Sequence, residues 1–150
     1  MTPPTSDWLA RRLVEGAAEA ILFADVDGLV RAWNPGAEAM FGWPAAEILG
    51  KTMDVIIPER LRGRHWHGWR KVIETGVTRY SGGDLLAVPA VRKDGTGLSI
   101  EFSIQLVRDD GGAVLGFGAV VRDVTERWHK EKALRLRLKE LEAKVGGERA

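Results

Sequence analysis

An alternation of apolar and polar residues over positions 98–106 constrains the fold of this chain more than any other feature. The apolar positions are Leu98, Ile100, Phe102, Ile104 and Leu106, and the polar ones are Ser99, Glu101, Ser103 and Gln105. Successive side chains of a β-strand point to opposite faces, so this pattern predicts a strand with one dry and one wet face. Such strands are typical of antiparallel sheets that are covered on one side.

Four other runs are also predicted to be strands, and glycine turns separate several of them. Residues 21–24 and 29–33 flank Asp27-Gly28, which is a favoured turn pair, and they therefore form a hairpin. In the run at 85–91, Pro89 cannot donate a backbone hydrogen bond, so this strand is expected at a sheet edge or at a bulge. Residues 113–121 follow another glycine turn and end the sheet.

Capping residues and glycines mark the helices. Ser6 or Asp7 caps the first helix, which we expect to lie on a neighbouring surface. Asn34 caps the second helix, which Gly42 terminates, and Gly76 ends a longer one. The expected helices cover residues 6–17, 35–40, 44–50, 58–74 and 125–150. This order predicts an α+β fold in which helices cover one face of an antiparallel sheet.

Composition excludes several function classes. The chain contains no cysteine, which excludes disulfides, thiolate catalysis and cysteinyl-flavin photochemistry. Its net charge of +1 gives no strong field that would attract nucleic acid or an anionic membrane. Neither a signal peptide nor an apolar run long enough to span a membrane is present, so we expect a cytoplasmic protein. Known catalytic motifs are also missing, and we expect no enzyme activity.

The helix at 58–74 contains the histidine of greatest interest. Leu61, His65, Trp69 and Val72 recur at helical spacing and form one apolar stripe, whereas His67 falls on the opposite side. An imidazole on such a face must form a hydrogen bond, stay neutral or coordinate a metal, because burying it charged and unpaired is costly. His65 is therefore either a structural histidine bonded within the core or a metal ligand.

The same helix is rich in basic residues with interleaved tryptophans, a composition that could grip a nucleic-acid backbone. Glu59 and Glu74 flank the segment, however, and the charges of the remaining chain are balanced. We favour a solvated helix face and predict no nucleic-acid partner. The residues concerned are Arg60, Arg62, Arg64, Trp66, Trp69, Arg70 and Lys71.

Strong helix formers dominate the chain from Thr125 onward. Leu134, Leu138, Leu141 and Val145 are spaced by four, three and four residues and form a seam of two heptads. This seam predicts a homodimeric coiled coil. A helix that folds back onto its own domain is the alternative.

Six short motifs follow one another in the order found in a known family. They read Ala24-Asp25-Val26-Asp27-Gly28, Ala32-Trp33-Asn34-Pro35, Met40-Phe41-Gly42-Trp43, Glu47-Ile48-Leu49-Gly50-Lys51, Arg92-Lys93-Asp94-Gly95 and Val121-Arg122-Asp123-Val124-Thr125-Glu126-Arg127. Over residues 13–127 the chain resembles a PAS sensor domain. The resemblance implies a five-stranded antiparallel sheet with short helices on one face that enclose a pocket. We expect residues 1–12 to form a leader and cap helix, 13–124 the PAS domain and 125–150 a signalling helix.

The segment from Ile57 to His65 is similar to the F helix of haem PAS domains in oxygen-sensing histidine kinases and phosphodiesterases. In those domains the histidine that matches His65 is the proximal iron ligand, so haem b is a candidate cofactor. Another small ligand, or none, is the alternative, because the same Arg-His pair also occurs in PAS domains without haem. The pocket is expected to be lined by Leu61, His65, Trp69, Val72, Leu86, Ile100, Phe102 and Val120.

The strand after this helix departs from the oxygen-sensing pattern. Those relatives place an arginine or a methionine there, whereas this chain has Gly83-Asp84-Leu85-Leu86. A bound haem would therefore have five-coordinate iron or a distal ligand of another kind.

The resemblance also implies how a signal would leave the domain. Arg122, Asp123 and Thr125 match the family's junction to an output helix, so we expect them to relay the state of the pocket to a downstream signalling protein. The alternative function is a constitutive dimerisation or docking module that holds no cofactor.

Overall fold

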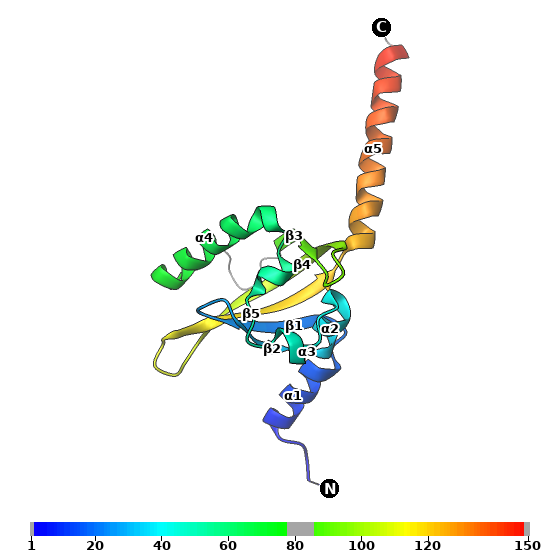
Figure 1. Cartoon of the computed structure of the whole chain (residues 1–150). Coiled ribbons are helices and arrows are strands. Elements are labelled where there is room, and N and C mark those ends of the chain that lie inside the picture. The colour runs from blue at the N-terminus through cyan, green and yellow to red at the C-terminus, as the bar shows by residue number, and fades with distance from the viewer. Residues whose placement is uncertain (1, 78–85, 149–150) are drawn as a thin grey trace.

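The computed structural model of the protein describes residues 2–77 and 86–148 (Figure 1). Its centre is a five-stranded antiparallel sheet in the order β2-β1-β5-β4-β3, which confirms the predicted fold class. The strands are β1 (Ala20–Asp25), β2 (Val30–Trp33), β3 (Leu86–Val91), β4 (Gly97–Arg108) and β5 (Val114–Asp123). The strands that come first and last in the sequence pair side by side, with Ala20 opposite Val121 and Asp25 opposite Gly116.

Pro89 lies in β3, which is an edge strand, as the missing N–H predicts. Its neighbour in the sheet is Ser99 of β4. The predicted beginning of this strand, at Leu85, lies outside the described residues.

The helices are short except for the one that carries His65 and the two near the chain ends. They are α1 (Ser6–Gly16), α2 (Pro35–Phe41), α3 (Ala45–Ile48), the 3-10 helix η1 (Met53–Ile56), α4 (Glu59–Thr75) and α5 (Thr125–Glu148). The predicted glycine caps are confirmed, because Gly42 and Gly76 both adopt positive φ, at 76° and 66°.

Two predictions about α1 are wrong. Thr5 caps this helix by accepting a hydrogen bond from the Trp8 N–H at 3.2 Å, whereas Ser6 and Asp7 are its first helical residues. None of its side chains is buried, and Leu13 is 72% exposed, so its apolar residues do not pack on a neighbouring surface.

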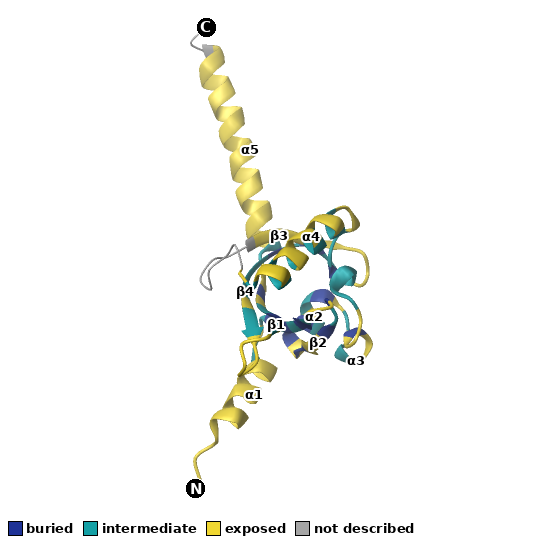
Figure 2. Cartoon of the chain, turned by 90° about the vertical axis from the view of Figure 1, so that its left-hand side faces the viewer, coloured by how far each residue is buried: buried dark blue, intermediate teal, exposed yellow. Residues whose placement is uncertain are grey.

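The hydrophobic core lies where the inner face of the sheet meets α2, α3 and η1 (Figure 2). Phe41, Ile48 and Val30 are its largest fully buried side chains. Farther along β4 the side chains of Phe102, Ile104 and Leu106 are half-buried rather than buried. Side chains on the inner face are therefore fully covered at one end of the sheet and only partly covered at the other. We call the second end the loosely closed end.

Helices α1 and α5 project from opposite sides of the domain (Figure 1), and Figure 2 shows both as exposed along their lengths. Among the described residues, no helix has the length and the apolar character that crossing a membrane requires.

Candidate functional site

Helix α4 is fastened to the rest of the domain by two tryptophans. The Trp69 indole Nε1 donates to the Val26 carbonyl at 3.1 Å, and the Trp66 Nε1 donates to the Asp54 carboxylate at 2.5 Å. The Trp66 ring also lies directly on Gly28, where an added Cβ would come within 2.1 Å of it. Gly28 thus serves both the hairpin turn, with a φ of 79°, and the close approach of α4.

These contacts place His65 in a group of rings that we call the aromatic cluster (His65, Trp66, Trp69 and Phe117). The His65 ring centroid lies 4.7 Å from that of Trp66 and 5.7 Å from that of Trp69. Trp69 in turn lies 4.4 Å from Phe117 of β5, centroid to centroid. The cluster therefore fills the space between α4 and the loosely closed end of the inner face.

The imidazole of His65 is half-buried, and its Nδ1 atom is buried with no hydrogen-bond partner among the described residues. Burial lowers the pKa of His65, and the Asp54 carboxylate opposes this shift only in part. The lowered pKa favours the neutral ring near pH 7. The neutral imidazole is the form that ligates metals, and it has one donor and one acceptor nitrogen. His67, one residue beyond Trp66, is exposed, as its position on the opposite face predicts.

Stability is expected to fall in acid because of His65. The unfolded chain retains the ordinary pKa of 6.5, whereas the folded protein binds the proton less readily, so protonation favours unfolding. The free energy of unfolding should be highest above about pH 6.5 and should drop below it by at most about 1.4 kcal/mol per pH unit. Urea titrations of the protein between about pH 7.5 and pH 5 would measure this slope. His65→Phe should flatten it, and equal slopes in both proteins would contradict a buried neutral imidazole.

The expected pocket residues with described side chains lie on α4, β4 and β5. Leu61 and Val72 are half-buried on α4, while Ile100 is buried and Phe102 is half-buried on the inner face. Leu86 stands opposite Phe102 in the sheet register, but its side chain, like residues 83–85, lies outside what the structure describes.

Val120 does not face inward, which corrects the prediction. It lies between Ala119 and Val121, whose side chains face inward with the core, and the alternation of the strand turns it to the outer face. There it is 39% exposed. Phe117 occupies the corresponding inward position on β5, and sequence reasoning missed it.

The predicted relay residues lie together at the root of α5. The Asp123 carboxylate accepts hydrogen bonds from the Thr125 N–H at 2.9 Å and from its hydroxyl at 2.5 Å. The Thr125 hydroxyl oxygen accepts one from the Ser99 N–H of β4 at 3.0 Å. Arg122 points elsewhere and forms an ion pair with Glu19 at 2.8 Å. Asp123 and Thr125 therefore connect the end of β5, the start of α5 and β4.

Arg92 extends this network toward the core, and sequence reasoning did not assign it a role. Its guanidinium bonds to the Asp123 carboxylate at 3.2 Å and donates to the Met40 carbonyl of α2, also at 3.2 Å. The next residue also bonds to a carbonyl of α2, since the Lys93 N–H donates to the carbonyl of the fully buried Phe41 at 2.9 Å. Arg92 thus connects α2 to the start of α5 through its hydrogen bonds.

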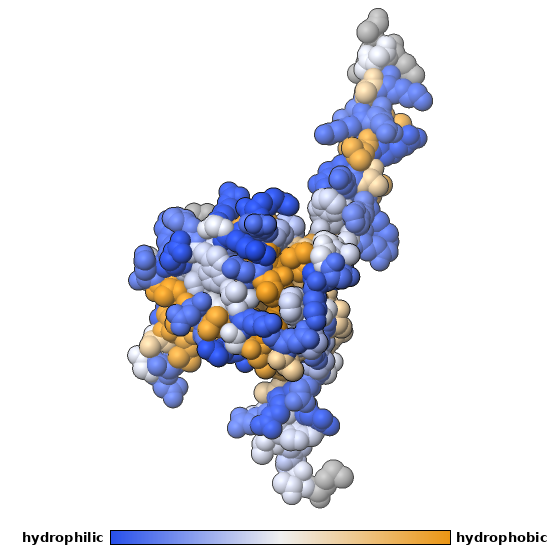
Figure 3. All heavy atoms as spheres, viewed as in Figure 1, coloured by the Kyte–Doolittle hydropathy of each residue, from blue (hydrophilic) through white to orange (hydrophobic). Residues whose placement is uncertain are grey.

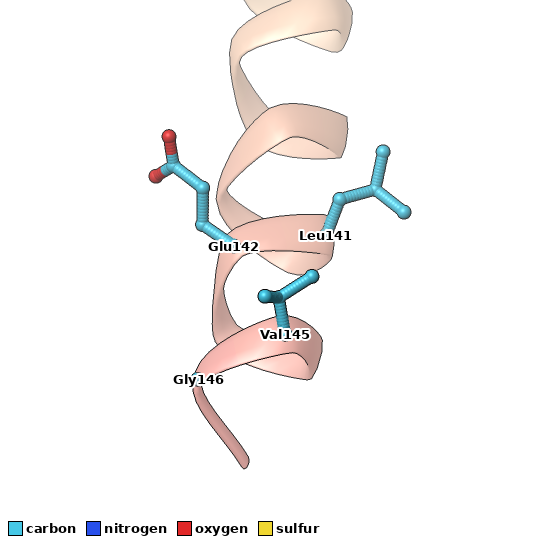
Figure 4. A pocket seen from close by; sticks show the side chains of 4 residues that line it. All are labelled: Leu141, Glu142, Val145 and Gly146. Carbon is cyan, nitrogen blue, oxygen red and sulfur yellow. The ribbon is translucent and has the colours of Figure 1, made fainter. Parts of the chain in front are cut away.

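The heptad seam of α5 is exposed in the single chain. Leu134, Leu138, Leu141 and Val145 are 69%, 57%, 43% and 48% exposed. Leu141 and Val145 line an open hollow near the end of the helix, together with Glu142 and Gly146 (Figure 4). In the described structure the seam does not fold back onto its own domain.

Comparison with known families decides what kind of domain this is. A family model described as the PAS fold matches residues 14–129, which is most of the chain. The chain belongs to the PAS family. PAS domains are in general sensory modules without catalytic activity of their own, so this chain is a PAS sensory domain by descent.

The PAS domain also resembles named sensors. The sensor protein FixL of Bradyrhizobium diazoefficiens is 26% identical over 133 residues, which cover 84% of this chain and 24% of FixL. The oxygen sensor protein DosP of Escherichia coli is 31% identical over 105 residues, which cover 69% of this chain and 13% of DosP. The chain thus spans less than a quarter of the length of each of these curated relatives.

Among solved structures, the PAS domain of a protein from Colwellia psychrerythraea is similar in fold. It matches with a TM-score of 0.68 at 18% identity, and the match covers 79% of this chain and 96% of the other.

The donor atoms of this PAS domain fit a haem better than a bare metal ion. Among the described residues no three histidine or carboxylate side chains gather to hold a metal, whereas a haem needs one axial imidazole because the macrocycle supplies the other nitrogen ligands. The unpartnered imidazole of His65 is such a group. The space beside it is occupied by Trp69, so the aromatic cluster would have to rearrange to admit a haem.

Proposed function

We propose that this PAS domain is a sensor that holds a haem, or another flat apolar ligand, between α4 and the inner face of its sheet. The observation that carries the proposal is the buried Nδ1 atom of His65, which finds no partner among the described residues. An unsatisfied buried polar atom costs about 1–3 kcal/mol and is rare in native proteins unless it has a use. A ligand that bonds to the imidazole would recover this cost.

His65 would supply the iron ligand, and side chains of α4 and β4 would line the site. A bound haem would supply an iron centre that can bind small diatomic molecules. The lining would come from Leu61, Trp69, Val72, Ile100 and Phe102.

Binding would have to move Trp69. Its indole would leave the Phe117 ring and release the hydrogen bond to the Val26 carbonyl, so α4 would lose one of the two tryptophan hydrogen bonds that hold it to the domain. Ligand binding would in this way change how α4 lies on the sheet. A ligand shifts an equilibrium between two arrangements only by its difference in affinity for them, and the displacement of Trp69 supplies such a difference.

The signal would leave the domain through the hydrogen-bond network around Arg92 and Asp123. A change in the core would reach Arg92 through the Met40 carbonyl and would alter the hydrogen bonds that hold the start of α5. Helix α5 would then pass the change to a downstream signalling protein, across a homodimer formed by its heptad seam.

The alternative is a docking module with no ligand, and one observation favours it. The aromatic cluster already fills the space beside His65, and such ring contacts stabilise a core without any cofactor. Uptake of haem by the wild-type protein would exclude this alternative.

An absorption spectrum tests the proposal. Protein purified with haem supplied is expected to show an intense Soret band, and His65→Ala should abolish it. His67→Ala is the matched control, because this exposed histidine lies on the same helix and faces solvent, and it should retain the band. A wild-type protein that never takes up haem would overturn the haem proposal and leave the docking module or another small ligand, and a band unchanged in His65→Ala would exclude this histidine as the ligand.

A further inference from the structure

The solvent face of α4 carries a row of two arginines, a histidine and a lysine that the aromatic cluster does not use. Arg60, Arg64, His67 and Lys71 follow one another at i, i+4, i+7 and i+11 and are all exposed. This spacing places them on one face of the helix, and at a rise of 1.5 Å per residue the row is about 16 Å long. We call it the basic stripe. In Figure 3 hydrophilic residues gather where Figure 1 places α4.

Folding does not neutralise the basic stripe within the described part of the chain. None of the ion pairs formed there involves a residue of α4. Arg62, by contrast, turns inward and donates to the Asp54 and Ile57 carbonyls at 3.2 and 3.0 Å. The stripe is thus a set of charges left for solvent or for a partner.

We propose that the basic stripe docks an acidic helix of a partner protein. Residues three and four apart on a helix are about 5–6 Å from one another, so carboxylates at the same spacing on a facing helix would meet the cations in register. Arginine also binds carboxylates in a bidentate geometry that lysine cannot reproduce. The indole bonds of Trp66 and Trp69 hold α4 in place, so little order has to be gained on docking.

Three features favour an acidic helix over nucleic acid. Trp66 and Trp69, which could stack on bases, are turned inward against Gly28 and Phe117. Glu74 continues the same helix face one turn after Lys71 and ends the stripe with the opposite charge. The chain as a whole has a net charge of +1 and so offers no wider field to a long phosphate backbone.

Fluorescence anisotropy with a labelled helical peptide tests this docking surface. The probe is an alanine-rich peptide with glutamates at i, i+4, i+7 and i+11, and the comparison is a peptide of the same composition with the glutamates spread around the helix. Arg60→Glu/Arg64→Glu/Lys71→Glu should weaken binding of the first peptide by about tenfold or more at low salt, because three attractions become repulsions. Glutamate is a good helix former, so α4 should keep its helicity by circular dichroism.

The matched control is Arg11→Glu/Arg135→Glu/Lys139→Glu, which makes the same change in net charge at exposed positions outside α4. At the same ionic strength, it should bind the first peptide with an affinity within about twofold of that of the wild type. Equal binding of both peptides, equal loss in both triple variants, or no binding by the wild type would overturn the proposal. Tighter binding of a single-stranded RNA of about twelve nucleotides, lost in the α4 variant, would also overturn it and would assign the stripe to nucleic acid.

Discussion

Asn34→Ala is expected to lower the free energy of unfolding by about 3–5 kcal/mol, the largest effect on stability that we predict. The Asn34 side chain is 4% exposed. Its Oδ1 accepts hydrogen bonds from the N–H groups of Ile21 and Ala37 at 2.8 and 2.9 Å, and its Nδ2 donates to the carbonyls of Val14 and Glu19 at 2.9 and 3.0 Å. Alanine would leave four backbone groups without these partners. Urea unfolding followed by circular dichroism would measure the loss.

Two further variants make this prediction specific. Asn34→Asp keeps the acceptor but turns a carboxylate oxygen toward the Val14 and Glu19 carbonyls, so it should cost nearly as much as alanine when the carboxylate is ionised. Thr5→Ala removes one exposed capping bond and should cost about 1 kcal/mol or less. If Asn34→Ala were no more destabilising than Thr5→Ala, the four bonds would not be holding the junction of α1, β1 and α2 together.

This junction also shows what the sequence could predict and what it could not. The pair Asn34-Pro35 is a local signal, and it correctly predicted the start of α2. The bonds from Asn34 to Val14 and Glu19 join parts of the chain that are 20 and 15 residues away, and no local pattern reports them. The same holds for Arg92 and Asp123, whose ion pair spans 31 residues.

The strands were predictable where alternation was clear and unpredictable where it was not. In β4, polar residues separate apolar ones, so the inward face could be read directly and Ile100 and Phe102 were placed correctly. In β5, glycine and apolar residues occupy both faces, so the sequence pattern does not show which of them point inward. Val120 was assigned to the wrong face for this reason, and Phe117 was missed.

The candidate site was predictable as a helix face and unpredictable as a set of contacts. Helical periodicity alone placed His65 inward and His67 outward, as the structure has them. It could not show that Trp66 packs on Gly28 or that Trp69 contacts Phe117, because these contacts depend on how α4 crosses the sheet. Among the predicted lining residues, Trp69 therefore also fills the space between His65 and Phe117.

Leu138→Asp is expected to convert a dimer of this chain into a monomer. The seam residues of α5 are exposed in the single chain, and a parallel coiled coil would bury Leu138 of both copies at its centre. Losing two buried leucines costs about 3–6 kcal/mol, so the dissociation constant of the dimer should rise by about two to four powers of ten. Sedimentation velocity at micromolar concentration would measure the change.

Leu136→Asp is the matched control for this experiment, because Leu136 is 53% exposed on the same helix but lies off the seam. The domain should stay folded in both variants. Before Leu134, the same heptad spacing falls on Glu131 and Arg127, which are charged rather than apolar. Arg127 forms an ion pair with Glu101 of β4 at 3.1 Å. The apolar contact therefore begins beyond the root of α5, and an aspartate at 138 should leave the sheet undisturbed. A dimer that persists in Leu138→Asp, or that is lost equally in Leu136→Asp, would place the interface elsewhere, with the exposed apolar residues of α1 as the next surface to mutate.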